Sequence, residues 1–225
     1  MEKVTVKDLV DFKRKSDRAK KTFPQKIKNR EAKVKAKGEG GNWWTTSLSA
    51  IGNTYKNGDK DEIRKKIEDL NNRYNSTDVK LTKMQYTQNI EVLQSMLDYD
   101  FELIRPKENF AQVKSIYEQK TFEINGFPIQ AWPTSVFSFE KDSEKYIGAV
   151  WFITNKEPFK NSELGMFAEM LYRYLSKWYS SKFTIDPSFC IALEPKRGTH
   201  VTFKMIEDGD VVSILDKTIS EIKSF

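Results

Sequence analysis

The stretch Tyr146-Ile147-Gly148-Ala149-Val150-Trp151-Phe152-Ile153-Thr154 decides how this chain folds. From residue 147 to residue 153 every side chain is apolar or absent, and no polar side chain alternates with them. Such a run is typical of a strand that is covered on both faces, because alternating polar residues would mark a face open to water. Pro158 closes the segment. The pattern predicts a central strand over residues 146–154.

The residues after this strand predict a helix and a parallel partner strand. Apolar side chains recur with helical spacing at Leu164, Phe167, Ala168, Leu171, Tyr174, Leu175 and Trp178. The apolar run 189–193 predicts the next strand, and a strand–helix–strand crossover makes the two strands parallel with a right-handed connection. Alternation over 200–206 predicts another strand. Ile214 or Leu215, with Ile219 and Ile222, indicates a closing helix.

The residues before the central strand predict a hairpin. Asn125-Gly126 lies between 121–124 and 127–131, and this dipeptide is the strongest short-range hairpin signal. A short strand over 136–139 follows. Residues 106–225 are therefore expected to form a mixed sheet flanked by helices.

The first 105 residues read as helical, with no strand strong enough to name. Thr5-Val6-Lys7-Asp8 is a capping box, which predicts a helix from about residue 6 to residue 21, ending near Pro24. The other predicted helices run from Trp43-Trp44 to Tyr55, with a stop at Asn57-Gly58, over 63–74, and from a Thr82 cap to Leu97. The fold class is α+β, with a helical, basic region 1–105 and a mixed lobe 106–225.

Composition excludes several classes of site. The 225 residues contain one Cys and one His, so the chain cannot form an internal disulfide or a Cys/His zinc cage. Cys190 and His200 are poor candidates for a nucleophile and base, because Cys190 lies in a strand expected to be buried. No long apolar run or signal peptide is evident, so we expect a soluble, cytoplasmic protein without membrane contact.

The positive charge is concentrated at the start of the chain. Residues 1–37 hold 14 Lys/Arg and 5 Asp/Glu, a net +9, whereas the rest of the chain has 24 and 27, a net −3. Local positive charge of this kind is suited to phosphates, to an acidic protein, or simply to a solvated helix face. The nucleic-acid candidates are Lys13, Arg14, Lys15, Arg18, Lys20, Lys21, Lys26, Lys28 and Arg30, with Trp43 as a stacking platform.

The C-terminal half resembles the PD-(D/E)XK nuclease superfamily in topology and hydrophobic rhythm. The stretch from Ile129 to Phe137 resembles the family's Pro-Asp-plus-strand element, with Thr134 in place of the acid. The strand 147–153 and the following Thr154-Asn155-Lys156 resemble the next strand and its lysine, with Thr154 in place of the second acid. The resemblance implies a restriction-endonuclease-like core over about half of the chain.

The absence of these two acids bears on whether the resemblance implies an active nuclease. The family's chemistry needs clustered carboxylates that hold Mg²⁺ and a lysine that orients water. Only Lys156 matches. We therefore predict no metal site or cofactor. If an active nuclease remained, Lys156 would act with relocated acids, of which we select Glu163 and Glu169; Glu123, Glu140 and Asp142 are further candidates.

Three hypotheses follow from the sequence. The first is a nucleic-acid-associated binding protein, contacting DNA or RNA, with a catalytically degenerate nuclease-like lobe. The second is an active Mg²⁺-dependent nuclease with relocated acids. The third is a protein-interaction or assembly module that meets an acidic protein partner. A homodimer surface on the long helix is an alternative to core packing for Met166, Met170, Tyr172 and Tyr179.

Overall fold

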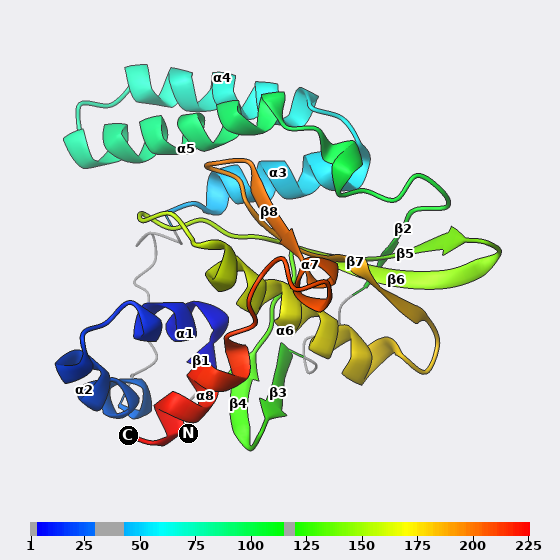
Figure 1. Ribbon diagram of the computed structural model, residues 1–225. Coiled ribbons are helices and arrows are strands. Elements are labelled where there is room, and N and C mark those ends of the chain that lie inside the picture. Colours follow the sequence, from blue (N-terminus) through cyan, green and yellow to red (C-terminus); the bar gives the residue numbers. More distant parts are fainter. Residues whose placement is uncertain (1–3, 30–42, 115–119) are drawn as a thin grey trace.

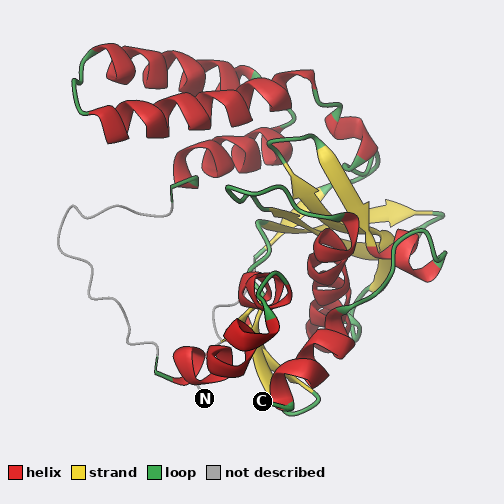
Figure 2. Ribbon diagram, turned by 60° about the vertical axis from the view of Figure 1, so that its left-hand side comes forward, coloured by secondary structure: helices red, strands yellow, loops and turns green. Residues whose placement is uncertain are grey.

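A computed structural model describes residues 4–29, 43–114 and 120–225 (Figures 1 and 2). Its helices are α1 Val6–Lys13, α2 Asp17–Lys28, α3 Thr45–Asn57, α4 Asp61–Asn75, α5 Lys80–Asp98, α6 Asn161–Tyr179, α7 Phe203–Glu207 and α8 Leu215–Lys223, with a 3₁₀ turn over Phe101–Leu103. Its strands are β1 Val4–Thr5, β2 Ala111–Val113, β3 Thr121–Ile124, β4 Phe127–Gln130, β5 Ser135–Lys141, β6 Glu144–Phe152, β7 Thr184–Glu194 and β8 Thr199–Thr202. None of the described helices combines the length and apolar character needed to cross a membrane.

The predicted α+β class and mixed sheet are confirmed. The larger sheet has the order β2-β5-β6-β7-β8, and β6 lies at its centre. β6 pairs in parallel with β7 through the α6 crossover, whereas the other neighbours are antiparallel. β5 and β6 join through Asp142 and Ser143, which both have positive φ and so form the left-handed turn that a two-residue hairpin requires.

Both faces of this sheet are covered, as the apolar run 147–153 indicates. Successive side chains of a strand point to opposite faces. Val136 and Ala149 accordingly pack against α6, whereas their neighbours Phe137 and Val150 pack against α3, α4 and α5. Figure 1 shows α6 on one side of the sheet and α3, α4 and α5 on the other. Two hydrophobic cores therefore share one sheet.

A second, three-stranded sheet contains the predicted hairpin. Its order is β1-β4-β3, and Asn125 and Gly126 form the tight turn with φ values of 52° and 72°. We expected no strand in the first 105 residues, but Val4 and Thr5 pair in parallel with Ile129 and Gln130. Two residues are too few to show a period, so the sequence pattern could not reveal β1. The edge strand β2 was missed for the same reason.

The first predicted helix is two helices. The expected helix over 6–21 begins with the confirmed Thr5–Asp8 capping box but ends at Lys13, and α2 starts at Asp17. Pro24 lies inside α2 instead of ending it. Phe23 and Ile27 are buried on either side of Pro24, and this packing offsets the hydrogen bond that proline cannot donate.

The prediction for 200–206 is wrong in its second half. β8 stops at Thr202, whose hydroxyl accepts a hydrogen bond from the backbone N–H of Met205 at 3.3 Å and caps the short helix α7. Phe203 and Met205 still pack against the core. The change from strand to helix alters the path of the backbone but leaves both side chains on the apolar surface. The start of α5, at Lys80 instead of Thr82, is a smaller difference.

The two ranges 1–105 and 106–225 are joined by packing. α1 lies against α8 and α6, α2 lies against α8, and α3 packs on β6, so each hydrophobic core contains residues from both ranges. Met166, Met170 and Tyr179 are buried inside the chain, and Tyr172 stacks on Phe203 with ring centres 4.0 Å apart. The core-packing alternative therefore holds for this part of α6, while a homodimer stays a prediction.

Gly148 in β6 tests the double-sided packing. A Cβ atom there would lie 2.7 Å from Cβ of Phe189 and 2.8 Å from the ring of Phe137. We expect Gly148→Ala to lower the free energy of unfolding by about 1–3 kcal/mol, because the strand is covered and cannot shift freely. Urea unfolding would measure this.

The control is Gly126→Asn in the hairpin turn. A Cβ atom at Gly126 has open space around it, and Asn tolerates the left-handed conformation. This variant should change stability by less than about 1 kcal/mol. An equal loss in both variants would contradict the explanation for Gly148.

Candidate functional site

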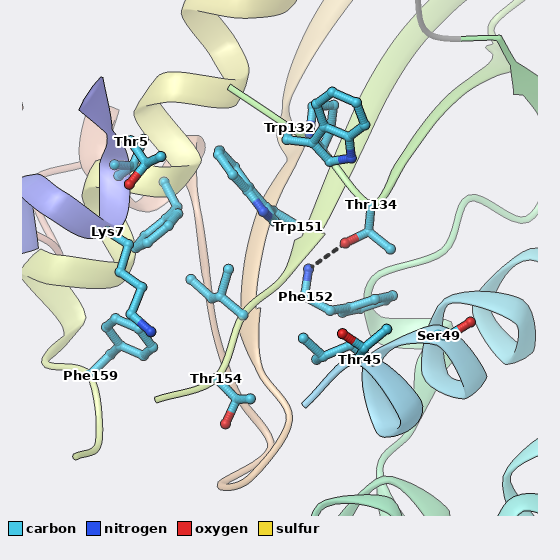
Figure 3. Close-up of a pocket in the computed structure, with 15 residues that line it drawn as sticks. Thr5, Lys7, Thr45, Ser49, Trp132, Thr134, Trp151, Phe152, Thr154 and Phe159 are labelled. Atoms are coloured by element: carbon cyan, nitrogen blue, oxygen red, sulfur yellow. Dashed lines mark hydrogen bonds between the residues drawn. The ribbon is translucent and has the colours of Figure 1, made fainter. Parts of the chain in front are cut away.

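The principal cleft lies where several strands end. It has a volume of about 520 Å³ and is bordered by the residues that follow β1, β4 and β6. The first turns of α1 and α3 complete its sides (Figure 3). Ligands of α/β proteins commonly bind at the carboxyl ends of parallel strands, where loops and helix starts converge.

The lining of this cleft is aromatic and hydroxylic. The aromatic lining residues are Trp132, Trp151, Phe152, Phe159 and Phe167. The hydroxyl groups come from Thr5, Thr45, Ser49, Thr134 and Thr154. Lys7 is the one charged side chain among the described lining residues, which include no carboxylate.

Thr134 and Thr154, the residues that the nuclease resemblance aligns with the family's acids, both line this cleft. The hydroxyl of Thr134 accepts a hydrogen bond from the backbone N–H of Phe152 at 3.0 Å, so it secures the end of β6. Thr154 is 6% exposed, and within the described residues its hydroxyl has no hydrogen-bond partner. Both side chains are neutral, so neither supplies the charge that a Mg²⁺ site needs.

Lys156 lies outside the cleft. It borders a separate depression of about 340 Å³ together with Asp11, Arg14, Lys15, Asn155 and Glu157. Burial raises the pKa of Asp11 despite the nearby cations. Two carboxylates thus share a depression with Lys156, although among the described residues no group of three or more His, Cys, Asp or Glu side chains could hold a metal ion.

Glu163 and Arg14, predicted for different roles, bind each other. The guanidinium donates from Nε to Oε1 at 2.8 Å and from Nη2 to Oε2 at 2.5 Å. Glu163 also accepts from the backbone N–H of Lys160 at 2.8 Å, at the start of α6. Burial favours a higher pKa for Glu163, but the hydrogen bonds from Arg14 and Lys160 outweigh it and lower the pKa below the usual value.

Glu169 has partners of its own further along α6. Its two oxygens accept from Arg173 at 2.6 Å and from the hydroxyl of Ser213 at 2.7 Å. Arg173 is also bonded to Asp216 on α8. Glu163 and Glu169 therefore both hold contacts between α6 and other parts of the fold, and neither borders the depression that contains Lys156.

The predicted basic residues divide into two groups. Lys13 and Lys20 both bind Glu221 of α8, at 2.9 and 2.7 Å, and Lys15 lies over the ring of Phe23. Arg18, Lys21 and Lys26 of α2 are exposed, and no ion pair within the described residues engages them. The side chain of Lys28 and the whole of Arg30 lie outside the described residues.

The Trp43-Trp44 pair is anchored to α5. Trp44 is buried, which confirms that one of the two belongs to the core. The indole N–H of Trp43 donates to Oε1 of Gln88 at 2.9 Å, and its carbonyl accepts from Asn89 at 2.9 Å. Trp43 thus has a structural role in the start of α3, whatever else it contacts.

Glu194 was missed by the sequence reasoning. It ends β7, is 0% exposed, and accepts from the backbone N–H of Phe159, a cleft residue, at 3.3 and 3.4 Å. Burial raises its pKa above the usual value, although Arg197 and Arg14 oppose this. A single Glu after an apolar run gives no signal of burial, because it also suits a strand end that is open to water.

No family model, characterised protein or solved structure matches this chain. Function is therefore inferred from the chemistry of the cleft, of the Lys156 depression and of the exposed face of α2.

The Arg14–Glu163 pair has a testable pH dependence. Arg14→Met leaves Glu163 buried without its cation, so we expect a loss of about 3 kcal/mol in unfolding free energy at pH 7. Because the pKa of Glu163 is lowered in the folded protein, its contribution is present above the unfolded pKa and is lost as pH falls through the folded pKa. Urea unfolding from pH 7 to pH 3 should show the difference shrinking; a constant difference would contradict an ionic role.

Glu194 should behave in the opposite way. A raised pKa in the folded state means that ionisation opposes folding, so this penalty appears as pH rises through the folded pKa. Glu194→Gln keeps an acceptor for the Phe159 N–H but cannot ionise. In urea unfolding, the variant should be more stable than the parent at pH 8 and equally stable near pH 4. Greater stability of the parent at pH 8 would refute this explanation.

Proposed function

We propose that this protein binds nucleic acid through the exposed face of α2 and has a nuclease-like lobe that no longer cleaves. The observation that carries the proposal is a set of three exposed cations that form no ion pair with any residue the structure describes: Arg18, Lys21 and Lys26. At 3.6 residues per turn they fall within an arc of about 140° of the helix. Phe23 and Ile27 occupy the opposite, buried face, so α2 presents its charge to solvent.

The charge distribution supports this role. The region 1–37 is strongly basic, yet Lys13, Arg14 and Lys20 are bonded to carboxylates within the fold. Cations held in internal ion pairs contribute little to phosphate binding. The three exposed cations are therefore the residues of α2 that we assign to phosphates, which attract such side chains independently of base sequence.

The arrangement of the larger sheet supports the second part of the proposal. The β5–β6 hairpin is followed by the long helix α6 and the parallel strand β7, the order that the PD-(D/E)XK resemblance implies. The neutral residues Thr134 and Thr154 both line the cleft beside that hairpin. A cleft of this composition is suited to binding, because hydroxyl groups hold no divalent metal on their own.

An active nuclease is the second candidate, and the Lys156 depression is the observation that favours it. Asp11 and Glu157 border the same depression and supply two hard oxygen ligands beside a lysine. Mg²⁺- or Mn²⁺-dependent cleavage of DNA or RNA that is abolished by Lys156→Ala would establish this activity and replace the non-cleaving proposal.

Nucleic-acid binding is tested by charge removal on α2. The variant Arg18→Gln/Lys21→Gln/Lys26→Gln should weaken binding by about tenfold or more. It should also reduce the magnitude of the slope of log K against log salt by about 2–3, because counterions are no longer released at the three lost phosphate contacts. Fluorescence anisotropy with labelled single- and double-stranded DNA and RNA, at several salt concentrations, measures both quantities.

The matched control removes the same charge elsewhere. Lys65, Lys107 and Lys145 are exposed and lie outside α2, so their triple Gln variant should bind almost as well as the parent. Equal effects in the two triple variants would show that net charge alone matters. Binding that survives the α2 variant, or complex formation with an acidic protein and with no nucleic acid, would contradict the proposal.

A further inference from the structure

The principal cleft offers aromatic surface that the α2 proposal does not use. Trp151 packs edge-on against Phe167, with ring centres 5.2 Å apart at 90°, and remains partly exposed. Trp132 is 47% exposed at the rim. Figure 3 shows both indoles projecting from the upper side of the cleft. Indole rings stack on planar ligands such as nucleic-acid bases, at about 1–3 kcal/mol per base.

The polar groups of the cleft suit a ligand with an anionic part. Lys7 extends from α1 on one side, while Thr45 and Ser49 project from α3 on the other (Figure 3). These three side chains are exposed, and Thr45 and Ser49 lie one helical turn apart. The described lining contains one positive charge and no carboxylate. It therefore attracts an anionic ligand and has no negative charge that would bind a cationic one.

The volume limits the size of the ligand. A cleft of about 520 Å³ lies within the range of small-molecule sites, about 300–1,000 Å³. A single nucleotide combines the three chemical features that the lining recognises: a planar base, a sugar with hydroxyl groups and a phosphate.

We propose that this cleft binds one nucleotide, with the base against the indole of Trp151 and the phosphate near Lys7. The nucleotide is either a free nucleoside monophosphate or the terminal nucleotide of a strand. If the nucleotide is the end of a strand, this proposal rests on the proposed nucleic-acid binding. If it is a free nucleoside monophosphate, the proposal is independent of that function. It uses none of the cations of α2.

The test is a titration followed by the indole ¹H–¹⁵N signals of the full chain, with the Trp151 signal assigned by Trp151→Phe. Adenosine and uridine 5′-monophosphates should shift this signal, and adenosine without phosphate should bind at least about tenfold more weakly. Lys7→Gln should weaken the binding of both nucleotides by about tenfold, since a charge-assisted hydrogen bond to the phosphate is lost. Ser49→Phe, at an exposed position of α3, should fill the cleft and abolish binding.

Lys65→Gln is the matched control and should leave nucleotide binding unchanged. The triple α2 variant should also bind mononucleotides like the parent, which separates this proposal from the proposed function. If long oligonucleotides fail to bind but mononucleotides bind at Trp151, the proposed function fails and the cleft proposal stands.

Two arms distinguish the sources of the nucleotide. Linear oligonucleotides with a terminal phosphate that compete with the mononucleotide, while a circular strand does not, would support the strand terminus; competition by neither would support a free nucleotide. The proposal is overturned if the Trp151 signal does not move at nucleotide concentrations up to about 10 mM, if adenosine binds as tightly as its phosphate, or if Ser49→Phe and Lys7→Gln leave binding unchanged.

Discussion

The rest of the structure depends on the contacts made by the guanidinium group of Arg14. It binds both oxygens of Glu163, donates to the carbonyls of Glu157 and Pro158, and lies 5.4 Å from the ring centre of Phe159. The side chain that follows α1 therefore holds residues 157–159 of the connection between β6 and α6. Phe159 lines the principal cleft and α1 forms one of its sides, so this contact joins two parts of the cleft wall.

The positive charge of the chain has two different uses. Lys13, Arg14 and Lys20 fasten α1 and α2 to α6 and α8, where carboxylates meet them inside the fold. Arg18, Lys21 and Lys26, from the same stretch of sequence, face solvent. Net charge by itself does not separate the two uses, because the difference depends on which helix face meets α8.

The sequence was informative where a local pattern determines structure. The unbroken apolar run over 147–153, the helical period after it and the Asn125-Gly126 turn correctly predict β6, α6 and the hairpin, since each depends on neighbouring residues alone. The partner of Arg14 could not be predicted, because Glu163 is 149 residues away in the chain. The same limit applies to the site: Thr134 and Thr154 line one cleft, whereas Lys156, two residues beyond Thr154, borders another depression.

The pairing of β1 with β4 has a consequence for how the protein is made. Val4 finds its partner in Ile129, and Lys13 finds its partner in Glu221, so these contacts between the first helices and the rest of the fold form only after residues 129 and 221 have been synthesised. Contacts so distant in sequence form late and slow folding, because a long loop must close first. During translation the basic segment leaves the ribosome long before α8 can neutralise it. The order of synthesis thus gives the nascent chain a more positive surface than the finished protein.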